Sequence, residues 1–400
     1  MNKNSTLEYI KFLEKSFLSR FSGSNSVVLG LSGGVDSSVC LYLAHELGLK
    51  VRPVYINVSE NPDACRSTQD YLDALHVASK FNLKLELVDY SVEYRKEVYD
   101  KVLEGYERGE VPNPDILCNS TVKFKAFNGV DCDSAIVTGH YAWLSGCNVS
   151  GSGDVCHSSS EIKSSILTPL DTSKDQSYFL SSLIGEPLIL DKLFFPLGGL
   201  HKNDVREIAK MVDLPNYNKP DSQGVCMVGS STMLDFLKSN IAVTPGKVFN
   251  LLGNEIGRHY GSVFYVVGQR HGFEITKYQG RPLYVVQKNI KDNILIVGDK
   301  GDCYKRSLKF KNLILGGTKS NFSDFISGKQ KVYARIRNLG SMVEVGEVMF
   351  DEATGTFHAK FEEPVFGVNP GQEIVFYEYV SDCGDLGYSP MQMTGVGRIV

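Results

Sequence analysis

The first half of the chain alternates between short apolar runs and longer stretches in which apolar residues recur every three or four positions. A short apolar run bounded by turn residues is typical of a buried strand, whereas the three-to-four spacing is typical of a helix with one buried face. Because the two patterns alternate with short connections, they predict an α/β domain with a parallel sheet covered by helices. The expected strands are 26–31, 51–56, 84–88 and 134–138, and the expected helices are 36–47, 68–81, 93–107 and 119–128.

From about residue 240 the pattern changes to short runs separated by Pro, Gly and Asn. Regularly spaced short strands of this kind are typical of β structure without helical crossovers. We expect a small β-rich central domain followed by a C-terminal β-barrel. The expected strands are 247–252, 263–267, 283–288, 294–297, 331–336, 343–350, 356–361 and 373–377. With 400 residues to divide, the expected domains are 1–222, 223–304 and 305–400, with a Ser- and Gly-rich surface insertion at 146–165.

The first 25 residues predict a further amphipathic helix, opening with a capping box formed by Ser5 and Glu8. Acidic residues stand among the basic ones, so the segment lacks the features of a signal or transit peptide. No uninterrupted apolar run of about 18 residues occurs, which argues against a transmembrane helix. We therefore expect a cytoplasmic protein.

The apolar run Val27–Leu29 leads into Gly30-Leu31-Ser32-Gly33-Gly34-Val35-Asp36-Ser37-Ser38, directly before an expected helix. Two adjacent glycines permit positive φ and let an anion reach the backbone N–H groups, while the positive end of the helix points at the same place. The lysine of Walker A and the third glycine of the Rossmann fingerprint are both missing. Asp36 could hold a magnesium ion or cap the helix. The string resembles the PP-loop of the N-type ATP pyrophosphatases, with an ordinary glycine turn as the alternative.

Charge and cysteine content add two constraints. Nine cysteines, an odd number without framework spacing, fit a reducing compartment. Cys147, Cys156 and His157 match no standard zinc spacing, so we expect no resident metal. The net charge of −4 excludes an overall positive surface, yet nine Lys or Arg residues stand against one acid between Lys305 and Arg337. That segment is either a solvated basic face or a surface for a polyanion.

Two cysteines stand in contexts that suit sulfur chemistry. Cys118 follows the proline-fixed loop Val111–Asp115 and lies close to the start of an expected helix, whose dipole would stabilise a thiolate. Asp115 is three residues away, within reach for general acid–base work. Cys226 follows the polar turn Asp221–Gly224. Two such cysteines suit a sulfur relay, although both could equally be buried small hydrophobes.

Taken together, eight short strings resemble the family of tRNA-specific 2-thiouridylases, in the family's order and over nearly the whole chain. The resemblance implies that ATP, with Mg2+, adenylates the C2 oxygen of wobble uridine 34 in tRNA. A persulfide sulfur then replaces that oxygen, giving 2-thiouridine, AMP and pyrophosphate. The strings are residues 32–38, 113–119, 139–142, 174–180, 195–198, 221–226, 268–270 and 370–372.

The resemblance also implies roles for individual residues. Cys226 would carry the persulfide, Cys118 would attack it and close a transient Cys118–Cys226 disulfide, and Asp115 would manage the proton. ATP would be held by Gly30, Leu31, Ser32, Gly33, Gly34, Val35, Asp36, Ser37, Ile56 and Gly139. The tRNA would be contacted by Asn113, Pro114, Asp115, His140, Lys174, Asp175, Gln176, Arg335, Ile336 and Gln372, the first three at the target base.

The same resemblance implies a monomer that acts on the anticodon arm of Lys, Glu or Gln tRNAs and takes sulfur from a relay protein or a cysteine desulfurase. Ser120 and Trp143 depart from the family, where basic residues are usual, and so weaken the expected tRNA contacts there. Two alternatives stay open on the sequence. One is another PP-loop enzyme that adenylates a small substrate without cysteines, and the other is an RNA-binding module with a relic nucleotide loop.

Overall fold

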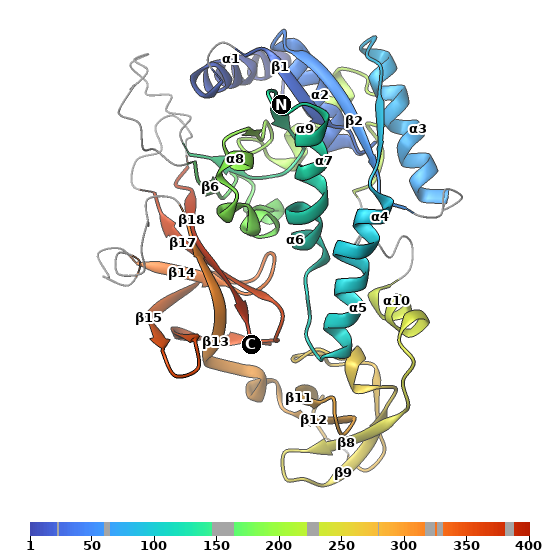
Figure 1. Cartoon of the computed structure of the whole chain (residues 1–400), viewed down its shortest axis with the longest axis vertical. Helices are drawn as coiled ribbons and strands as arrows, with labels where there is room; N and C mark the ends of the chain where they lie inside the picture. Colours follow the sequence, from blue (N-terminus) through green and yellow to red (C-terminus); the bar gives the residue numbers. More distant parts are fainter. Residues whose placement is uncertain are drawn as a thin grey trace.

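The computed structural model describes residues 1–21, 24–59, 65–145, 164–221, 232–278, 280–316, 325, 331–380 and 388–400. Three sheets organise these described residues. A parallel sheet lies at one end of the long axis, a mixed middle sheet at the other, and an antiparallel C-terminal sheet to one side between them (Figure 1). The predicted fold class is confirmed.

The parallel sheet has the strand order β3-β2-β1-β4-β7. At its centre β1 pairs with both β2 and β4, so the carboxyl ends of β1 and β4 meet at one edge, where ligands bind in such sheets. Four of its strands match predicted ones, whereas β7 is too short to show a pattern. The strands are β1 (Ser26–Gly30), β2 (Lys50–Asn57), β3 (Glu86–Asp89), β4 (Ala135–Val137) and β7 (Leu193–Phe194).

The helices include two continuous runs with a π-helical turn in the middle. The predicted helix 93–107 is one run of α4 (Ser91–Tyr94), η1 (Arg95–Tyr99) and α5 (Asp100–Glu107). The predicted helix 119–128 begins earlier than expected, as α6 (Pro114–Cys118), η2 (Asn119–Lys123) and α7 (Phe124–Val130). The other described helical segments of this half are α1 (Lys3–Arg20), α2 (Val35–Glu46), α3 (Cys65–Lys80), η3 (Thr172–Lys174), η4 (Ser177–Gly185), α8 (Pro187–Leu190), α9 (Lys202–Met211) and α10 (Met233–Asn240).

The first helix starts before the predicted capping box, which is therefore wrong. Asn2 is the N-cap of α1, and its side chain accepts from the backbone N–H of Ser5. Ser5 thus lies inside the first turn, because an Asn cap is available three residues earlier. None of the helices in the described ranges combines the length and apolar character that a membrane span requires.

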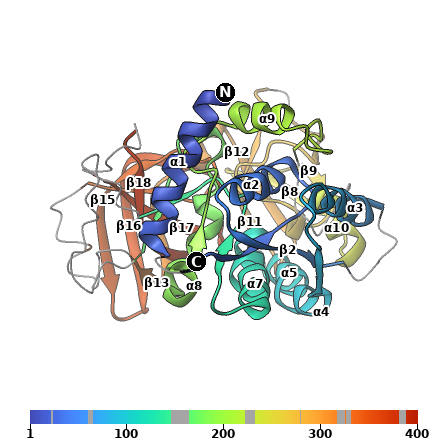
Figure 2. The same cartoon turned by 90° about the horizontal axis from the view of Figure 1, so that it is seen from above.

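Both faces of the parallel sheet are covered. On one face Val27 and Leu29 of β1 pack with α1, α2, α3 and α9, and Figure 2 shows α1, α2 and α9 above the sheet. On the other face Val28 packs with α7 and η4, and the same core continues into Val375 and Tyr377 of the C-terminal sheet. The parallel-sheet half and the C-terminal sheet therefore share one hydrophobic core.

The second half forms two sheets. The middle sheet has the order β10-β9-β8-β12-β11, and the C-terminal sheet has the order β13-β16-β15-β14-β17-β18-β6-β5, with β13 also pairing with β18 to close a barrel. The middle elements are β8 (Gly246–Asn250), β9 (Glu255–His259), η6 (Ser262–Phe264), β10 (Phe273–Ile275), β11 (Tyr284–Asn289), β12 (Ile294–Gly298) and η7 (Lys300–Cys303). The C-terminal strands are β13 (Tyr304–Leu315), β14 (Val332–Arg335), β15 (Val343–Asp351), β16 (Thr356–Phe366), β17 (Glu373–Tyr379) and β18 (Met391–Ile399), joined by β5 (Trp143–Leu144) and β6 (Ile166–Leu167).

The predicted strand 263–267 is wrong. Its apolar residues form the 3-10 turn η6, and Val263, Phe264 and Tyr265 are buried in the core between the middle sheet and α5. A short apolar run does not by itself distinguish a strand from another buried segment. Of the predicted insertion 146–165, residues 146–163 lie outside the described residues.

Candidate nucleotide and cysteine site

The glycine loop between β1 and α2 is shaped to receive an anion. Gly33 has φ +77°, and a Cβ there would collide with the backbone oxygen of Asp70. Gly34 is the N-cap of α2, so no side chain caps the first N–H groups of this helix. The atom nearest to a Cβ built at Gly34 is Ser32 Oγ, at 3.5 Å, so the space beside this glycine is open. An uncapped helix N-terminus behind an open glycine fits a phosphate group.

Hydroxyl groups and a distant loop hold this shape. Ser37 Oγ accepts from the backbone N–H of Ser32 at 3.2 Å and donates to the carbonyl of Gly34 at 3.0 Å. The carbonyl of Gly33 accepts from Asn216 Nδ2 at 2.8 Å and from Lys219 Nζ at 3.1 Å. Asn216 and Lys219 follow α9, more than 180 residues later, and no local pattern points to them.

Asp36 does not cap α2, so that alternative is wrong. Its Oδ1 accepts from Lys202 Nζ at 2.6 Å and from the hydroxyl of Tyr141 at 2.9 Å. Gly139 lies against the same turn, because a Cβ there would stand 2.9 Å from the backbone nitrogen of Ser37. Among the other predicted ATP residues, Leu31 and Val35 are buried in the core and Ile56 packs on the opposite face of the sheet.

Cys118 lies on the helical run that packs against β1. The side chain of Asn113 caps this run by accepting from the N–H groups of Asp115 and Ile116, and Pro114 occupies its first turn. Cys118 is half-buried beside Val98 and Val122. Because the run begins at Pro114, Cys118 lies beyond the first turn, and the predicted stabilisation by the helix N-terminus is wrong.

Asp115, one turn before Cys118, has the electrostatics of an acid–base group. Burial raises the pKa of this carboxyl, and the positive charge of Lys123 opposes the rise. The far end of the run is tied to the nucleotide loop, since a Cβ at Gly30 would collide with the ring of Phe127. Cys226 lies outside the described residues, so its pairing with Cys118 stays a prediction.

Two of the residues predicted to contact tRNA are an internal ion pair. Arg335 Nη2 lies 2.6 Å from Asp175 Oδ2, and both side chains are only 4% exposed. Arg335 also donates to Ser177 Oγ and the hydroxyl of Tyr377. Ile336 is buried too. In this structure these side chains join η4 to the C-terminal sheet and do not face solvent, so contact of Arg335, Ile336 and Asp175 with RNA stays a prediction.

The other predicted tRNA residues differ in exposure. His140 is buried against Phe124 and Phe195, and burial together with Lys123 holds its pKa well below the usual value, so a neutral imidazole sits in the core. Lys174 is partly exposed, and its Nζ lies 2.8 Å from Asp221 Oδ2. Gln176 accepts from the backbone N–H of Tyr141.

Gln372 belongs to a junction between the C-terminal sheet and the loop that follows α5. Its Oε1 is buried without a hydrogen-bond partner among the described residues. Its neighbour Gly371 has φ +85°, and a Cβ there would stand 2.8 Å from the backbone nitrogen of Val111. The N–H of Val111 donates to the carbonyl of Pro370 at 2.7 Å, and Arg398 Nη2 donates to Glu110 Oε2 at 2.8 Å. The loop that leads to Cys118 is therefore fixed by the C-terminal sheet.

The basic segment from Lys305 to Arg337 is exposed only in part. Lys305, Lys309 and Lys311 project from β13 and alternate with the buried Leu308 and Phe310. Arg335 is buried, as described above, and Lys319 and Lys329 lie outside the described residues. Among the described members, only Arg335 is buried and so absent from the basic surface that the sequence suggests, whereas the lysines of β13 lie on it.

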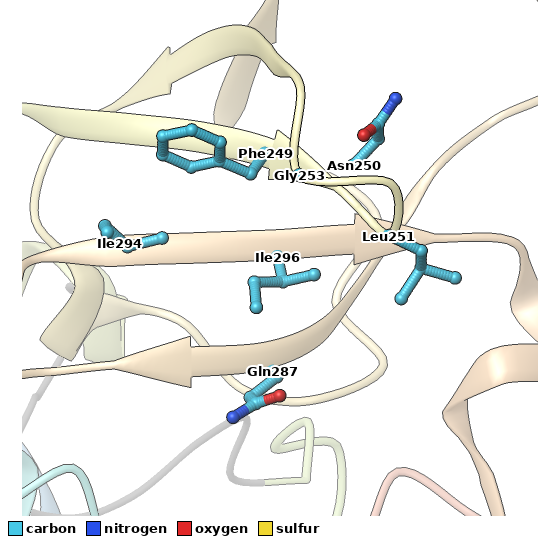
Figure 3. A pocket seen from close by; sticks show the side chains of 7 residues that line it. All are labelled: Phe249, Asn250, Leu251, Gly253, Gln287, Ile294 and Ile296. Atoms are coloured by element: carbon cyan, nitrogen blue, oxygen red, sulfur yellow. The ribbon is translucent and has the colours of Figure 1, made fainter.

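A shallow groove of about 400 Å3 lies far from this site, on the middle sheet (Figure 3). Phe249, Ile296 and Gln287 lie in register across β8, β12 and β11, and Leu251 closes one end. The lining contains no ionisable side chain. The groove has none of the groups that phosphate or sulfur chemistry needs.

Three family models match successive segments of this chain, one for each of the three domains. The tRNA methyl transferase HUP domain profile matches residues 25–230, the tRNA methyl transferase PRC-barrel domain profile matches 234–299, and the aminomethyltransferase beta-barrel domain profile matches 307–383. The tRNA-specific 2-thiouridylase MnmA of Hahella chejuensis is 36% identical over 370 residues, which is 88% of this chain and 94% of that protein. The MnmA of Buchnera aphidicola is 36% identical over 371 residues, 90% of this chain and 95% of that protein. The chain therefore belongs to the MnmA family of tRNA-specific 2-thiouridylases.

Proposed function

We propose that this chain is an ATP-dependent tRNA 2-thiouridylase that acts on wobble uridine 34. The observation that carries the proposal is the 36% identity to MnmA proteins over about nine-tenths of the chain. The glycine loop supports it from the structure, because its open backbone and uncapped helix fit the phosphates of ATP.

The first step would use the nucleotide loop. The C2 oxygen of uridine attacks the α-phosphate of ATP, the bond to pyrophosphate breaks, and AMP stays on the oxygen as a leaving group. The residues that would hold the phosphates are Ser32 to Ser37, with Gly139 beside them. Asp36, in the first turn of α2, is the carboxylate that would ligate Mg2+, and phosphate oxygens would supply further ligands, because no group of three metal-ligating side chains occurs within the described ranges.

The second step would use the two cysteines. The terminal sulfur of a persulfide on Cys226 attacks C2, and AMP leaves with the oxygen. The Cys118 thiolate then attacks the Cys226 sulfur, the sulfur–sulfur bond of the persulfide breaks, and a disulfide remains. Asp115, whose pKa is raised by burial, would take or return a proton at this stage. Asn113 and Pro114 fix the turn beside which the extruded base would lie.

The test is 2-thiouridine formation. Purified protein is incubated with ATP, Mg2+, a persulfide donor of sulfane sulfur and unmodified tRNA, and nucleosides are analysed by mass spectrometry. Wild type and the exposed-cysteine control Cys132→Ser should form 2-thiouridine, whereas Cys118→Ser and Cys226→Ser should form none. If both of the latter variants keep full activity, sulfur transfer through these cysteines is wrong, and a PP-loop synthetase without cysteine chemistry becomes the better reading.

A further inference from the structure

Five charged side chains form one cluster beside the nucleotide loop: Asp36, Lys174, Lys202, Arg206 and Asp221. Lys202 stands at its centre. Its Nζ lies 2.6 Å from Asp36 Oδ1 and 3.0 Å from Asp221 Oδ1, and the side chain is only 10% exposed. Asp221 also accepts from Lys174 and from Arg206. One ammonium group thus bridges the first turn of α2 and the segment after α9.

The backbone of Lys202 is held by one hydrogen bond, whereas its ammonium group is shared between Asp36 and Asp221. The backbone N–H of Lys202 donates to Asp171 Oδ2 at 2.9 Å at the start of α9. Asp171 is in turn held at the start of η3, where its side chain accepts hydrogen bonds from the backbone N–H and the hydroxyl of Ser173. The side chain therefore pivots from a rigid point close to the loop, and only its ammonium group has a choice of partners.

Ion pairs hold the charged groups of the cluster together. Three cations pair with two carboxylates beside the uncapped N-terminus of α2, and the nearby carboxylate of Asp171 accepts from the backbone N–H groups of Lys202 and Ser173 and from no ammonium group of the cluster. Burial would raise the pKa of Asp221, but hydrogen bonds from Lys174 and Lys202 outweigh it and lower the pKa to about 2. Asp221 is therefore ionised throughout the physiological range.

Of the three cations, Lys202 can break its ion pairs with Asp36 and Asp221 with the smallest loss of free energy, because both carboxylates keep other partners. Asp221 would keep Lys174 and Arg206 as partners. Asp36 would keep the hydroxyl of Tyr141 and would gain the divalent cation that accompanies a nucleotide. Lys174 and Arg206 cannot exchange a carboxylate of the nucleotide loop for a phosphate group in this way, because both pair with Asp221 and neither contacts the loop.

We propose that Lys202 is a further phosphate-binding residue of the nucleotide site, held by Asp36 when the site is empty and transferred to the phosphate oxygens when a divalent cation takes Asp36. The inference rests on the proposed use of ATP and adds a residue to it. It assigns Lys202 to the pyrophosphate portion of the nucleotide, since Asp36 lies in the turn that faces the phosphates.

Binding of the two product fragments separates this role from a structural one. Dissociation constants for inorganic pyrophosphate and for AMP, each with Mg2+, are measured by calorimetry on wild type, Lys202→Met and Lys202→Arg. The matched control is Lys210→Met, an exposed lysine on the same helix. Lys202→Met should weaken pyrophosphate binding at least about tenfold and AMP binding less than about twofold. Lys202→Arg, which keeps the charge, should restore most of the pyrophosphate affinity, and Lys210→Met should match wild type.

Two results would overturn the assignment: unchanged pyrophosphate affinity in Lys202→Met, or an equal loss for AMP and pyrophosphate. If Lys202→Met does not fold, Lys202→Gln makes the same comparison, because its amide can still donate to Asp221. Failure of the proposed function looks different: a wild-type protein without a nucleotide site would bind neither ATP nor pyrophosphate, and one without sulfur transfer would bind both but form no 2-thiouridine.

Discussion

A buried pair of charges connects the catalytic half of the chain to its C-terminal barrel. Arg335 and Asp175 lie 2.6 Å apart with almost no exposure, and Ser177 and Tyr377 complete their hydrogen bonds. Breaking a buried pair by removing one partner leaves an uncompensated charge in a region of low dielectric. We therefore expect these residues to affect RNA binding through the position of the barrel.

Replacing Arg335 by Met should lower the free energy of unfolding by about 3–5 kcal/mol, because Asp175 is left buried and unpaired. The double variant Arg335→Met with Asp175→Asn should lose less than the sum of the two single variants. Urea denaturation measures both. If Arg335→Met unfolds like wild type and only tRNA affinity falls, Arg335 contacts RNA directly and the positioning role is wrong.

Glu373 gives the molecule a pH-dependent contribution to stability. Burial raises its pKa to about 7, against the opposing charge of Arg398. A carboxyl whose pKa is raised by folding holds its proton more tightly in the folded state, so its contribution is full at acidic pH and is lost as the pH rises toward 7. Glu373→Gln should therefore stabilise the protein at pH 8 by about 1–3 kcal/mol and leave it unchanged at pH 4. Thermal unfolding at both pH values checks this, and an equal gain at both would contradict it.

At the scale of elements, the glycine loop could be predicted from the sequence, whereas the distant residues that hold it in place could not. Adjacent glycines before a helix allow the prediction of an anion site from local geometry alone. Lys202 and Asn216 act on that loop from far along the chain, and only tertiary packing brings them there. The helix that carries Cys118 shows the same limit, since its start at Pro114 changed the electrostatic argument for the thiol.

The two glycines of the loop should fail in different ways when replaced by Ala. Gly33→Ala should destabilise the fold, because φ is +77° and the new Cβ collides with Asp70. Gly34→Ala should fold normally, since its φ is −85° and nothing lies closer than 3.5 Å to the Cβ, yet ATP affinity should fall about tenfold as the methyl group occupies the phosphate approach. Calorimetry with ATP and a thermal melt test both, and full ATP affinity in Gly34→Ala would place the phosphates elsewhere.

At the scale of the whole molecule, the middle domain and the C-terminal barrel both contact the loop that leads to Cys118. Gly109 packs on Ile290 of the middle domain, and Val111 bonds to Pro370 of the barrel. The barrel also recruits β5 and β6 from the first half of the chain. Two-residue strands and pairings between distant segments leave no periodic signal, so the sequence predicted the barrel but not these connections.

This convergence predicts that the barrel positions the catalytic loop. Arg398→Met removes the bond to Glu110, and we expect the rate of 2-thiouridine formation to fall about tenfold while ATP affinity stays unchanged. Arg306→Met, on the exposed side of the barrel, is the control. Single-turnover kinetics and ATP titration give the two readouts, and an equal loss of both would indicate general unfolding.

The most direct measurement counts pyrophosphate and 2-thiouridine in the same reaction on unmodified tRNA. We predict one pyrophosphate released for each 2-thiouridine formed by the wild-type protein, and pyrophosphate without 2-thiouridine in Cys118→Ser. Pyrophosphate release by the wild-type protein with no 2-thiouridine, in the presence of a sulfur donor, would contradict this prediction.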